Sequence, residues 1–549
     1  GGSWGSRSWA LLLVLGGLLA SATAAFAFWT VGLIYAPGNF ALANAATLSA
    51  PTAPTATVNG SGAITIGWTL PGSQLAGAQY KVTRTSGPGS QTTVCTVASS
   101  VTSCQDTGLT ATTSYGYSVV AVLGTSWQSS SISVSTTTAT PTLAISLSAA
   151  PYTAGTPITV QTITAKIGGG TDTTYSGSKS IAWSGLANSP SGQAPVYPSS
   201  SLTFVSGVAS PTGAGAAFTA YAAGSNTLVG TDAAATSVTG SAPFTVINGT
   251  ATQIVLGGST TSLASGTTRV LTATIEDAAG NTVTGGTDST DSVTFSQPTG
   301  AGSVTGLGAA PASGGIATKT VTGSLIGGVN LQASATLPGG LTSSNTLSFT
   351  VTFGTATQVA LSGPAAGVGV GATKSLTATI EDAAGNTVTG GTDSTRVVTF
   401  AKTSGAGTVS GLGPATASGG VATVSVTGTA AGSVSVQASA TLTQGVTSSN
   451  TLTMAVNPAP TISLPTAGSP VTSVHNGTVS YTITGTGFVS GLTVTGNGSA
   501  TAVTVTSVTS TTITGTVTGS GGNGASGSFT VTNPDGGTVT SANGSFKNG

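Results

Sequence analysis

One long stretch of this sequence occurs twice. Residues 271–290 and 376–395 are identical, and both contain IEDAAGNTVTGGTDST. The same offset of 105 residues relates QASATL at 332–337 to 437–442, with no insertion or deletion between the copies. Repeats of solenoid proteins span about 20–50 residues, whereas about 100 residues make one β-sandwich. The sequence therefore predicts tandem copies of a whole domain.

Short segments throughout the chain alternate apolar residues with Thr or Ser. Examples are AITIGW at 63–68, SVSVQAS at 433–439 and TVSYTITG at 478–485. A period of two with many β-branched residues is typical of half-buried strands. We find no amphipathic helical pattern after residue 45. The predicted fold class is all-β.

Charged residues are scarce in this chain. They make up 4% of the sequence, with eleven basic and eleven acidic residues, against about 25% in ordinary globular domains. Eleven scattered cations form no basic stripe that could neutralise a row of phosphates. The composition therefore argues against a nucleic-acid partner.

The first 35 residues differ from the rest. Arg7 precedes an apolar run from Trp9 to about Leu19. The small-residue motifs ASA, ATA and AFA follow, and the apolar character continues to Tyr35. This pattern fits a signal peptide, and its length also fits a membrane anchor that is not removed. Both alternatives place the remaining chain outside the cell, secreted or attached to the surface. If the 1–35 segment is not cleaved, we expect the protein to contact the membrane through this segment.

Polar or Pro-marked joints divide the remaining chain. After a linker at 36–50, we expect five sandwiches at 51–139, 140–247, 248–352, 353–457 and 458–549. The joints between them are about three to six residues long, which limits relative motion. The sequence thus predicts a semi-rigid array.

Residues 51–139 resemble a fibronectin type III domain. The matching segments are AITIGWTLP with Trp68, YKVTRT, and LTATTSYGYSVVAV with Leu109 and Tyr115. The spacing of Leu109 and Tyr115 fits a tyrosine corner, in which the Tyr hydroxyl bonds to nearby backbone. The resemblance implies that these three residues have structural roles.

Residues 248–352 and 353–457 resemble bacterial Ig-like domains of group 1, the invasin/intimin type. The motifs are LTATIEDAAGNTVTGG, GAGTVSGLG and SGGVATVSVTG. Residues 140–247 look like a weaker relative. Residues 458–549 resemble an IPT/TIG-type domain through VSYTITGTGF and SFTVTNPDGG. Together these resemblances imply a bacterial extracellular stalk that projects an adhesive tip.

The two cysteines, Cys95 and Cys104, lie in two alternating segments on either side of a short turn. We expect them to face each other across a hairpin and to form a disulfide, which export favours. A metal site or a redox pair would need CxxC spacing or further ligands, and the segment has neither.

The repeated acidic stretch has two interpretations. Asp277 and Gly280 stand at the first and fourth positions of DAAG, as in a type I turn, where the Asp side chain bonds local N–H groups. Alternatively, Asp277, Asp288 and Asp291 could contribute to a Ca²⁺ site, which needs six to eight oxygen ligands. The second copy has Arg396 where the first has Asp291. We therefore favour the turn and expect no bound metal.

Groups for catalysis are few. The single histidine, His475, stands beside an Asn-Gly turn, and no GxSxG motif follows residue 5. We expect neither enzymatic activity nor a cofactor. The interpretation favoured by the sequence is a non-catalytic structural or adhesion protein whose partners are cell-wall, host or environmental glycans or surface proteins.

Two alternatives stay open at this point. The chain could be the accessory, non-catalytic region of a larger secreted carbohydrate-active enzyme, or it could bind polysaccharide itself. The second alternative needs exposed aromatic rings, for which Trp127, Trp183, Tyr197 and Tyr221 are the candidates.

Overall fold

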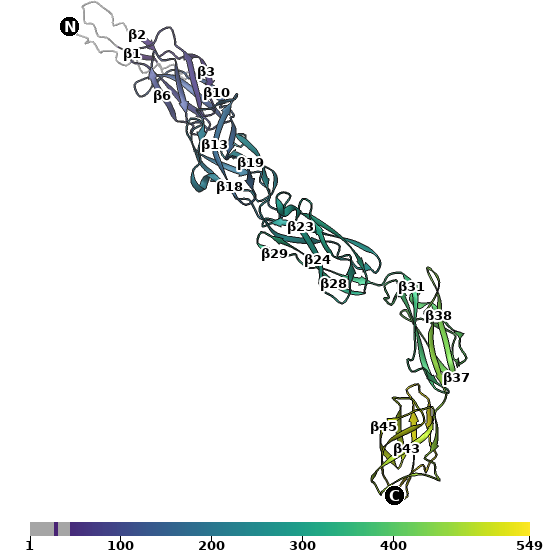
Figure 1. Ribbon diagram of the computed structural model, residues 1–549. Coiled ribbons are helices and arrows are strands. Elements are labelled where there is room, and N and C mark those ends of the chain that lie inside the picture. The colour runs from purple at the N-terminus through teal and green to yellow at the C-terminus, as the bar shows by residue number, and fades with distance from the viewer. Residues whose placement is uncertain (1–26, 31–43) are drawn as a thin grey trace, which may run out of the picture. The chain divides into compact units, whose positions relative to one another are not determined.

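The computed structural model describes residues 27–30 and 44–549. Most of the predicted signal or anchor segment and most of the predicted linker lie outside these residues. Strands β1 (Ala27–Thr30) and β2 (Asn44–Thr47) pair with each other. The rest of the described chain is built from strands with short 3-10 turns and no α-helix, so the all-β prediction is confirmed (Figure 1). No helix among the described residues is long and apolar enough to cross a membrane.

The chain divides into two compact units. The first comprises residues 1–252 together with 276–285, and the second comprises 253–275 together with 286–549. The strands group into five sandwiches, each made of two sheets, numbered here from the N-terminus.

The first sandwich has sheets in the orders β3-β4-β7 and β10-β8-β5-β6, with β9 on β8. Its core contains Trp68, Tyr80 and Tyr115, and Leu48 of the predicted linker joins them. Its strands are β3 (Thr52–Val58), β4 (Ala63–Thr69), β5 (Gln79–Ser86), β6 (Thr93–Ala98), β7 (Ser103–Thr107), β8 (Ser114–Leu123), β9 (Trp127–Gln128) and β10 (Ile132–Thr137).

The second sandwich has β11, β14, β17 and β18 around β13 in one sheet region, and the order β12-β20-β19-β15-β16 in the other. Tyr175, Phe204 and Phe218 are buried between them. The elements are β11 (Thr142–Leu147), β12 (Tyr152–Thr153), β13 (Pro157–Ile167), β14 (Gly170–Thr171), β15 (Gly177–Ser184), β16 (Ser201–Phe204), β17 (Val208–Ala209), η1 (Gly213–Ala216), β18 (Ala217–Thr219), β19 (Gly224–Asp232) and β20 (Thr239–Ile247).

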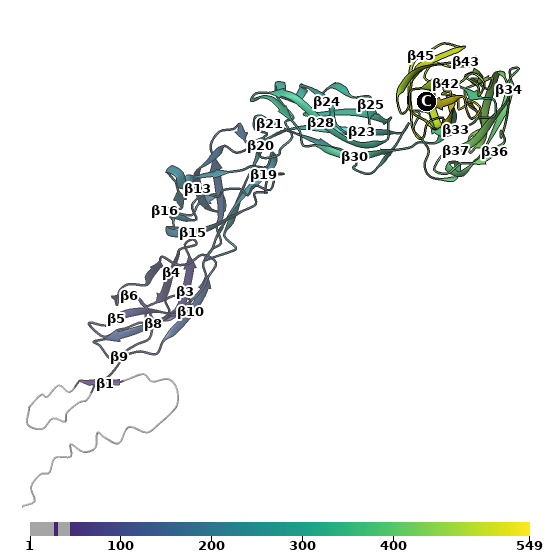
Figure 2. The same cartoon turned by 90° about the horizontal axis from the view of Figure 1, so that it is seen from below.

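The third sandwich has the orders β21-β23-β27-β25 and β22-β30-β28-β24-β26, with β29 on β28. The strands of its two sheets run roughly along a common direction (Figure 2), as in aligned sheet packing. Its elements are β21 (Ala251–Gly257), β22 (Leu263–Ala264), β23 (Thr268–Asp277), η2 (Thr287–Thr290), β24 (Ser292–Thr299), β25 (Val304–Thr305), β26 (Gly308–Pro311), β27 (Ile316–Gly323), β28 (Gly327–Leu337), β29 (Gly340–Ser343) and β30 (Leu347–Thr352).

The fourth sandwich repeats this topology strand for strand, with the orders β31-β33-β37-β35 and β32-β40-β38-β34-β36, and β39 on β38. Its elements are β31 (Ala356–Ser362), β32 (Val368–Gly369), β33 (Thr373–Asp382), η3 (Thr392–Thr395), β34 (Val397–Ser404), β35 (Thr408–Ser410), β36 (Pro414–Thr416), β37 (Val421–Ala430), β38 (Gly432–Leu442), β39 (Gly445–Ser448) and β40 (Leu452–Asn457).

The fifth sandwich has the orders β41-β43-β46-β45 and β42-β49-β47-β44, with β48 on β47. Tyr481, Phe529 and Phe546 form the centre of its core. Its strands are β41 (Thr461–Leu464), β42 (Val471–Ser473), β43 (Thr478–Thr486), β44 (Thr493–Gly498), β45 (Ala500–Val508), β46 (Thr512–Gly519), β47 (Ser526–Thr532), β48 (Thr538–Thr540) and β49 (Phe546–Asn548).

A short parallel pair recurs in four of the sandwiches. Strands β12, β22, β32 and β42 each pair in parallel with the last strand of their own sandwich, β20, β30, β40 and β49. The first part of each of these sandwiches thus supplies one strand to each sheet, because the segment before the short strand pairs in the other sheet. This change from one sheet to the other brings a strand near the beginning of the sandwich next to its last strand.

Leu376→Ala should destabilise the fourth sandwich by about 2–5 kcal/mol, because the side chain is fully buried and its loss leaves a cavity. Leu271→Ala should have an effect of similar size in the third sandwich, since the residue is equally buried. Scanning calorimetry of the full chain would measure both. Val446→Ala is the control, because Val446 is 77% exposed and should shift no transition appreciably.

Candidate functional site: the repeated acidic turn

The DAAGN segment forms a tight turn at the end of β23. The Gly280 N–H donates to the Asp277 carbonyl at 3.0 Å, and Gly280 has φ +80°, a conformation that favours glycine. Oδ1 of Asp277 accepts the N–H groups of Ala279 and Asn281, both at 2.9 Å. The carboxylate therefore bonds local N–H groups, as the turn interpretation predicted.

The same turn also holds residues from far back in the chain. Oδ2 of Asp277 accepts the Gly249 N–H at 2.7 Å. The Asn281 amide donates to the Tyr221 carbonyl at 2.8 Å, and its Oδ1 accepts the Ala223 N–H at 2.8 Å. All of these residues belong to the first compact unit. The sequence showed the turn but gave no sign of these long-range bonds.

The second copy makes the same set of bonds. Asp382 accepts N–H groups from Gly354 at 2.9 Å, Ala384 at 2.9 Å and Asn386 at 3.0 Å. The Asn386 amide donates to the Ser324 carbonyl at 2.7 Å, and its Oδ1 accepts the Ile326 N–H at 3.1 Å. Gly354 lies 105 residues after Gly249, so the partner is repeated along with the turn.

The electrostatics of Asp382 follow from these bonds. Burial on its own would raise the pKa of this carboxyl. Hydrogen bonds from Gly354, Asn386 and Ala384 outweigh burial, and the pKa of Asp382 is lowered below its ordinary value. The carboxylate is therefore the stable form at neutral pH.

The structure does not build the alternative Ca²⁺ site. Both oxygens of Asp277 are occupied by N–H donors, and the Asn281 amide adds bonds of 3.1 and 2.9 Å to them. Asp288 and Asp291 lie around η2 and are only partly buried. Within residues 27–30 and 44–549, no three His, Cys, Asp or Glu side chains are placed to hold a metal ion together.

The two copies differ beside the turn. In the fourth sandwich, Asp393 accepts Nε of Arg396 at 3.0 Å and both the N–H and the hydroxyl of Thr443. In the third sandwich, the positions of Arg396 and Thr443 hold Asp291 and Pro338. Proline has no N–H and no hydroxyl to donate. These bonds therefore hold the hairpin between β38 and β39 against η3 in the fourth sandwich. The equivalent hairpin of the third sandwich, between β28 and β29, lacks them.

The three residues predicted to be structural in the first sandwich are all buried. Trp68 is 5% exposed, Leu109 4% and Tyr115 1%. The Tyr115 hydroxyl accepts the Thr110 N–H at 2.9 Å, which is the geometry of a tyrosine corner. Arg84 lies over the Tyr115 ring and pairs with the buried Asp106. These contacts are packing contacts.

Cys95 and Cys104 are joined by a disulfide. The prediction that they face each other across a hairpin was wrong. Cys95 lies on β6, which pairs with β5, whereas Cys104 lies on β7, which pairs with β4 in the opposite sheet. The connection between β6 and β7 crosses from one sheet to the other, so the disulfide links the two layers of the first sandwich.

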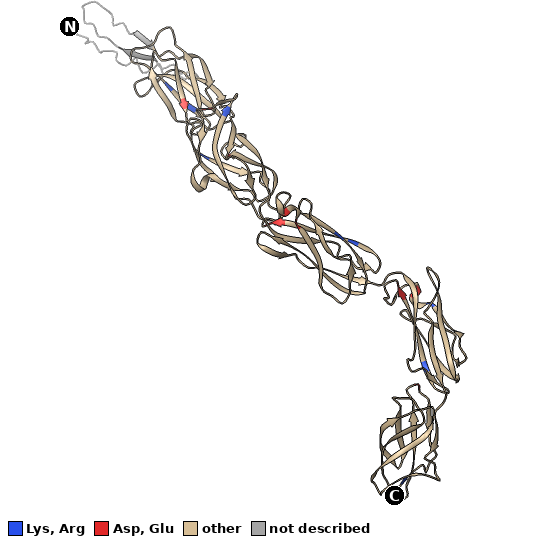
Figure 3. Cartoon of the chain, viewed as in Figure 1, with Lys and Arg blue, Asp and Glu red and all other residues tan. Residues whose placement is uncertain are grey.

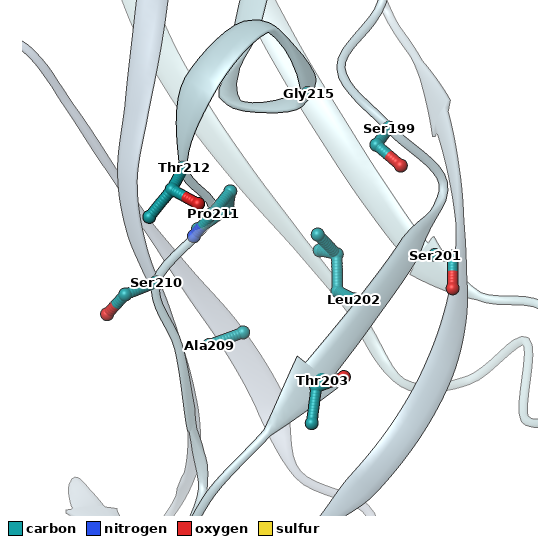
Figure 4. A pocket seen from close by; sticks show the side chains of 9 residues that line it. All are labelled: Ser199, Ser201, Leu202, Thr203, Ala209, Ser210, Pro211, Thr212 and Gly215. Atoms are coloured by element: carbon teal, nitrogen blue, oxygen red, sulfur yellow. The ribbon is translucent and has the colours of Figure 1, made fainter.

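The second sandwich contains a hollow of about 290 Å³ (Figure 4). Leu202 lies between Ser199 and Ser201 on one side and Ser210 and Thr212 on the other. The hollow is lined by Ser199, Ser201, Leu202, Thr203, Ala209, Ser210, Pro211, Thr212 and Gly215. This lining holds no acid, base or aromatic ring, and a catalytic or sugar-stacking site would need such groups.

Three of the four candidate aromatic residues pack against the cores, and the fourth, Tyr221, is half-buried. Trp183 and Tyr197 lie on the core of the second sandwich, and Trp127 lies on the core of the first. Nε1 of Trp183 donates to the Ser199 carbonyl at 3.1 Å. His475 is exposed, with the amide of Asn476 3.1 Å from its ring. Lys and Arg are scattered singly over the described sandwiches (Figure 3).

No family model matches this sequence, and no curated protein matches it. Among solved structures, the chain is similar to the Escherichia coli adhesin FdeC at 19% identity, covering 57% of this chain and 96% of that one, with a TM-score of 0.30. It is also similar to the Yersinia pseudotuberculosis adhesin InvE at 18% identity, 37% and 58% coverage and a TM-score of 0.18.

A third similar structure is the D00–D0 domain of intimin, at 15% identity, 37% and 98% coverage and a TM-score of 0.23. Intimin is one of the proteins that name the family resembled by residues 248–457. Since these TM-scores all lie below 0.5, the function proposed below rests on the residues of this chain.

Arg396→Ala should raise the pKa of Asp393 towards its ordinary value. Burial raises this pKa, but Arg396 and Thr443 outweigh burial and lower it. Because the folded pKa is lowered, the stabilisation is complete above the unfolded pKa of about 3.9 and is lost as the pH falls through the folded pKa. The pair joins an Arg396 side chain that is 36% exposed to a buried Asp393, and it should contribute about 0.2–1 kcal/mol at neutral pH.

An NMR titration of Asp393 in the wild type and in the variant would measure this change. An unchanged Asp393 pKa in the variant would show that Arg396 does not act on it.

Proposed function

We propose that this chain is a non-catalytic extracellular protein of the bacterial surface, whose tandem sandwiches space a binding surface away from the cell. Its partners, on this proposal, are glycans or proteins of a host, a cell wall or the environment. The observation that carries the proposal is the repeated junction: a 105-residue module brings with it both the acidic turn and the glycine that bonds to that turn.

Such a junction suits a protein that grows by adding modules. The turn of each copy accepts the N–H of a glycine just before its own sandwich, Gly249 or Gly354. Its Asn side chain binds the backbone of the preceding loop, at Ser324 and Ile326 in the second copy. Apart from the Ser265 hydroxyl, which accepts the Asn386 amide at 3.2 Å, the partners are backbone groups, so the next module requires few particular side chains there.

The polar groups of the described chain support a mechanical role. The buried carboxylates are occupied by structural partners, as with Asp232, which accepts the Tyr175 hydroxyl at 2.6 Å. General acid or base catalysis needs a poised group that can reach a substrate. A surface rich in hydroxyls and poor in charge is suited to remaining hydrated without depending on salt.

Deletion of residues 248–352 should shorten the protein without unfolding it. Gly354 then takes the place of Gly249, and Asn386 meets the Tyr221–Ala223 loop that Asn281 binds in the full chain. The maximum dimension from small-angle X-ray scattering should fall by roughly 35 Å, the length of an 11-residue strand such as β28.

Two outcomes would contradict the proposal. An unchanged maximum dimension would show that the module does not add length. Hydrolysis of a polysaccharide by the purified chain would show that it is an enzyme. The matched control is deletion of residues 353–457, which should shorten the protein by the same amount.

A further inference from the structure

The acidic residues of this chain are concentrated in one kind of position. Of the eleven acidic residues in the sequence, four lie in turns where a sandwich meets chain from the preceding one: Asp172, Asp277, Asp382 and Asp535. They are 6%, 2%, 2% and 0% exposed. Buried carboxylates are rare unless they are paired, and within residues 27–30 and 44–549 none of the four has a cation as its partner.

Asp172 shows the arrangement where no sequence is duplicated. Its Oδ2 accepts the Ser61 N–H at 2.9 Å, and the Thr174 hydroxyl accepts the Gly62 N–H at 3.0 Å. A Cβ at Gly62 would lie 2.2 Å from the Thr174 carbonyl oxygen. Only glycine therefore permits this approach between the first sandwich and the β14–β15 turn of the second.

Asp535 shows it a second time with different neighbours. Its Oδ2 accepts the side-chain amide of Asn457 at 2.7 Å, and its carbonyl accepts the Gly369 N–H at 3.1 Å. Oδ1 accepts the N–H of Gly537 in its own turn at 2.8 Å. A Cβ at Gly369 would lie 2.8 Å from the Gly537 Cα, so glycine is again needed at the contact.

We propose that these four aspartates are junction latches: each carboxylate orders the joint between consecutive segments with N–H donors, in the role that a bound divalent cation would otherwise fill. A carboxylate has about four lone-pair positions. Asp382 fills them with the N–H groups of Gly354, Ala384 and Asn386 and with the Asn386 amide. A cation would therefore have to displace bonds that already hold the joint.

Asp382 is the ionisable group on which its latch depends. A hollow of about 370 Å³ beside it is lined by Ser265, Gly266, Thr267, Gly323, Thr355, Thr357, Asp382, Ala383 and Ala384. Asp382 is the one ionisable residue of this lining. The neighbouring Glu381 is turned to the Gln358 amide at 3.3 Å. The latch thus depends on a single carboxylate at the edge of this hollow.

Hydrogen exchange of the full chain, followed by mass spectrometry, tests this proposal with Asp382→Asn. In this variant a side-chain NH₂ group replaces one carboxylate oxygen. It faces backbone N–H donors and cannot accept their hydrogen bonds. Exchange of peptides containing Gly354 and Ile326 should therefore become roughly tenfold faster or more. Peptides containing Gly249 and Ala223, at the intact Asp277 latch, should be unchanged. Glu381→Gln is the matched control and should leave all four peptides as in the wild type.

Asn386→Ala provides a second reading if Asp382→Asn exposes the core of the fourth sandwich. This variant keeps the bonds of Asp382 to Gly354 and Ala384 and removes those to Ser324 and Ile326. Only the Ile326 peptide should then exchange faster. Protection of Ile326 that persists in both variants would overturn the proposal, and so would slower exchange at the junctions of the wild type when millimolar Ca²⁺ replaces EDTA.

Discussion

A carboxylate that is surrounded by backbone N–H groups is the interaction on which the order of this chain depends. Turns at the ends of β-sandwiches leave N–H groups without partners in a sheet, and a buried N–H without an acceptor is costly. In a protein with 4% charged residues, acceptors of full charge are few. The chain places Asp172, Asp277, Asp382 and Asp535 where such donors converge. Each ionised side chain then satisfies donors from its own turn and from sequence-distant groups, which are backbone N–H groups except for the Asn457 side-chain amide at Asp535.

Carboxylates that accept hydrogen bonds from several neighbours also occur inside the sandwiches. Asp106 accepts Arg84 and the Tyr117 hydroxyl, and burial together with that hydrogen bond raises the pKa of Tyr117. Asp232 binds Tyr175 in the same way, with the same effect on the pKa of that tyrosine. Both tyrosines therefore stay neutral, and their hydroxyl groups donate hydrogen bonds to the carboxylates. The carboxylates of the chain act as fixed acceptors that position their neighbours.

The sequence was sufficient to predict the fold class and the turn, because both depend on local patterns. Alternation of apolar and hydroxyl residues predicts strands, and DAAGN predicts its own turn. The long-range partners of Asn281 and Asn386 could not be predicted. Apart from the Ser265 hydroxyl, they are backbone groups about 60 residues earlier in the chain, and backbone leaves no signature in sequence. The prediction that Cys95 and Cys104 face each other across a hairpin was wrong for a related reason. Two strands joined by a short turn need not pair when the chain crosses to the other sheet.

The parallel pairing of β32 with β40 has a consequence for load. The chain enters the fourth sandwich at β31 in one sheet, and the next strand, β32, is hydrogen-bonded in parallel to β40, the strand at which the chain leaves. A pull that is transmitted to β32 and β40 drags them past each other, so their bonds resist in shear and break together rather than one by one. The pairs β22–β30 and β42–β49 have the same geometry. Resistance to force is then set by the rate of unfolding rather than by equilibrium stability, which suits a chain that is held at one end and pulled at the other.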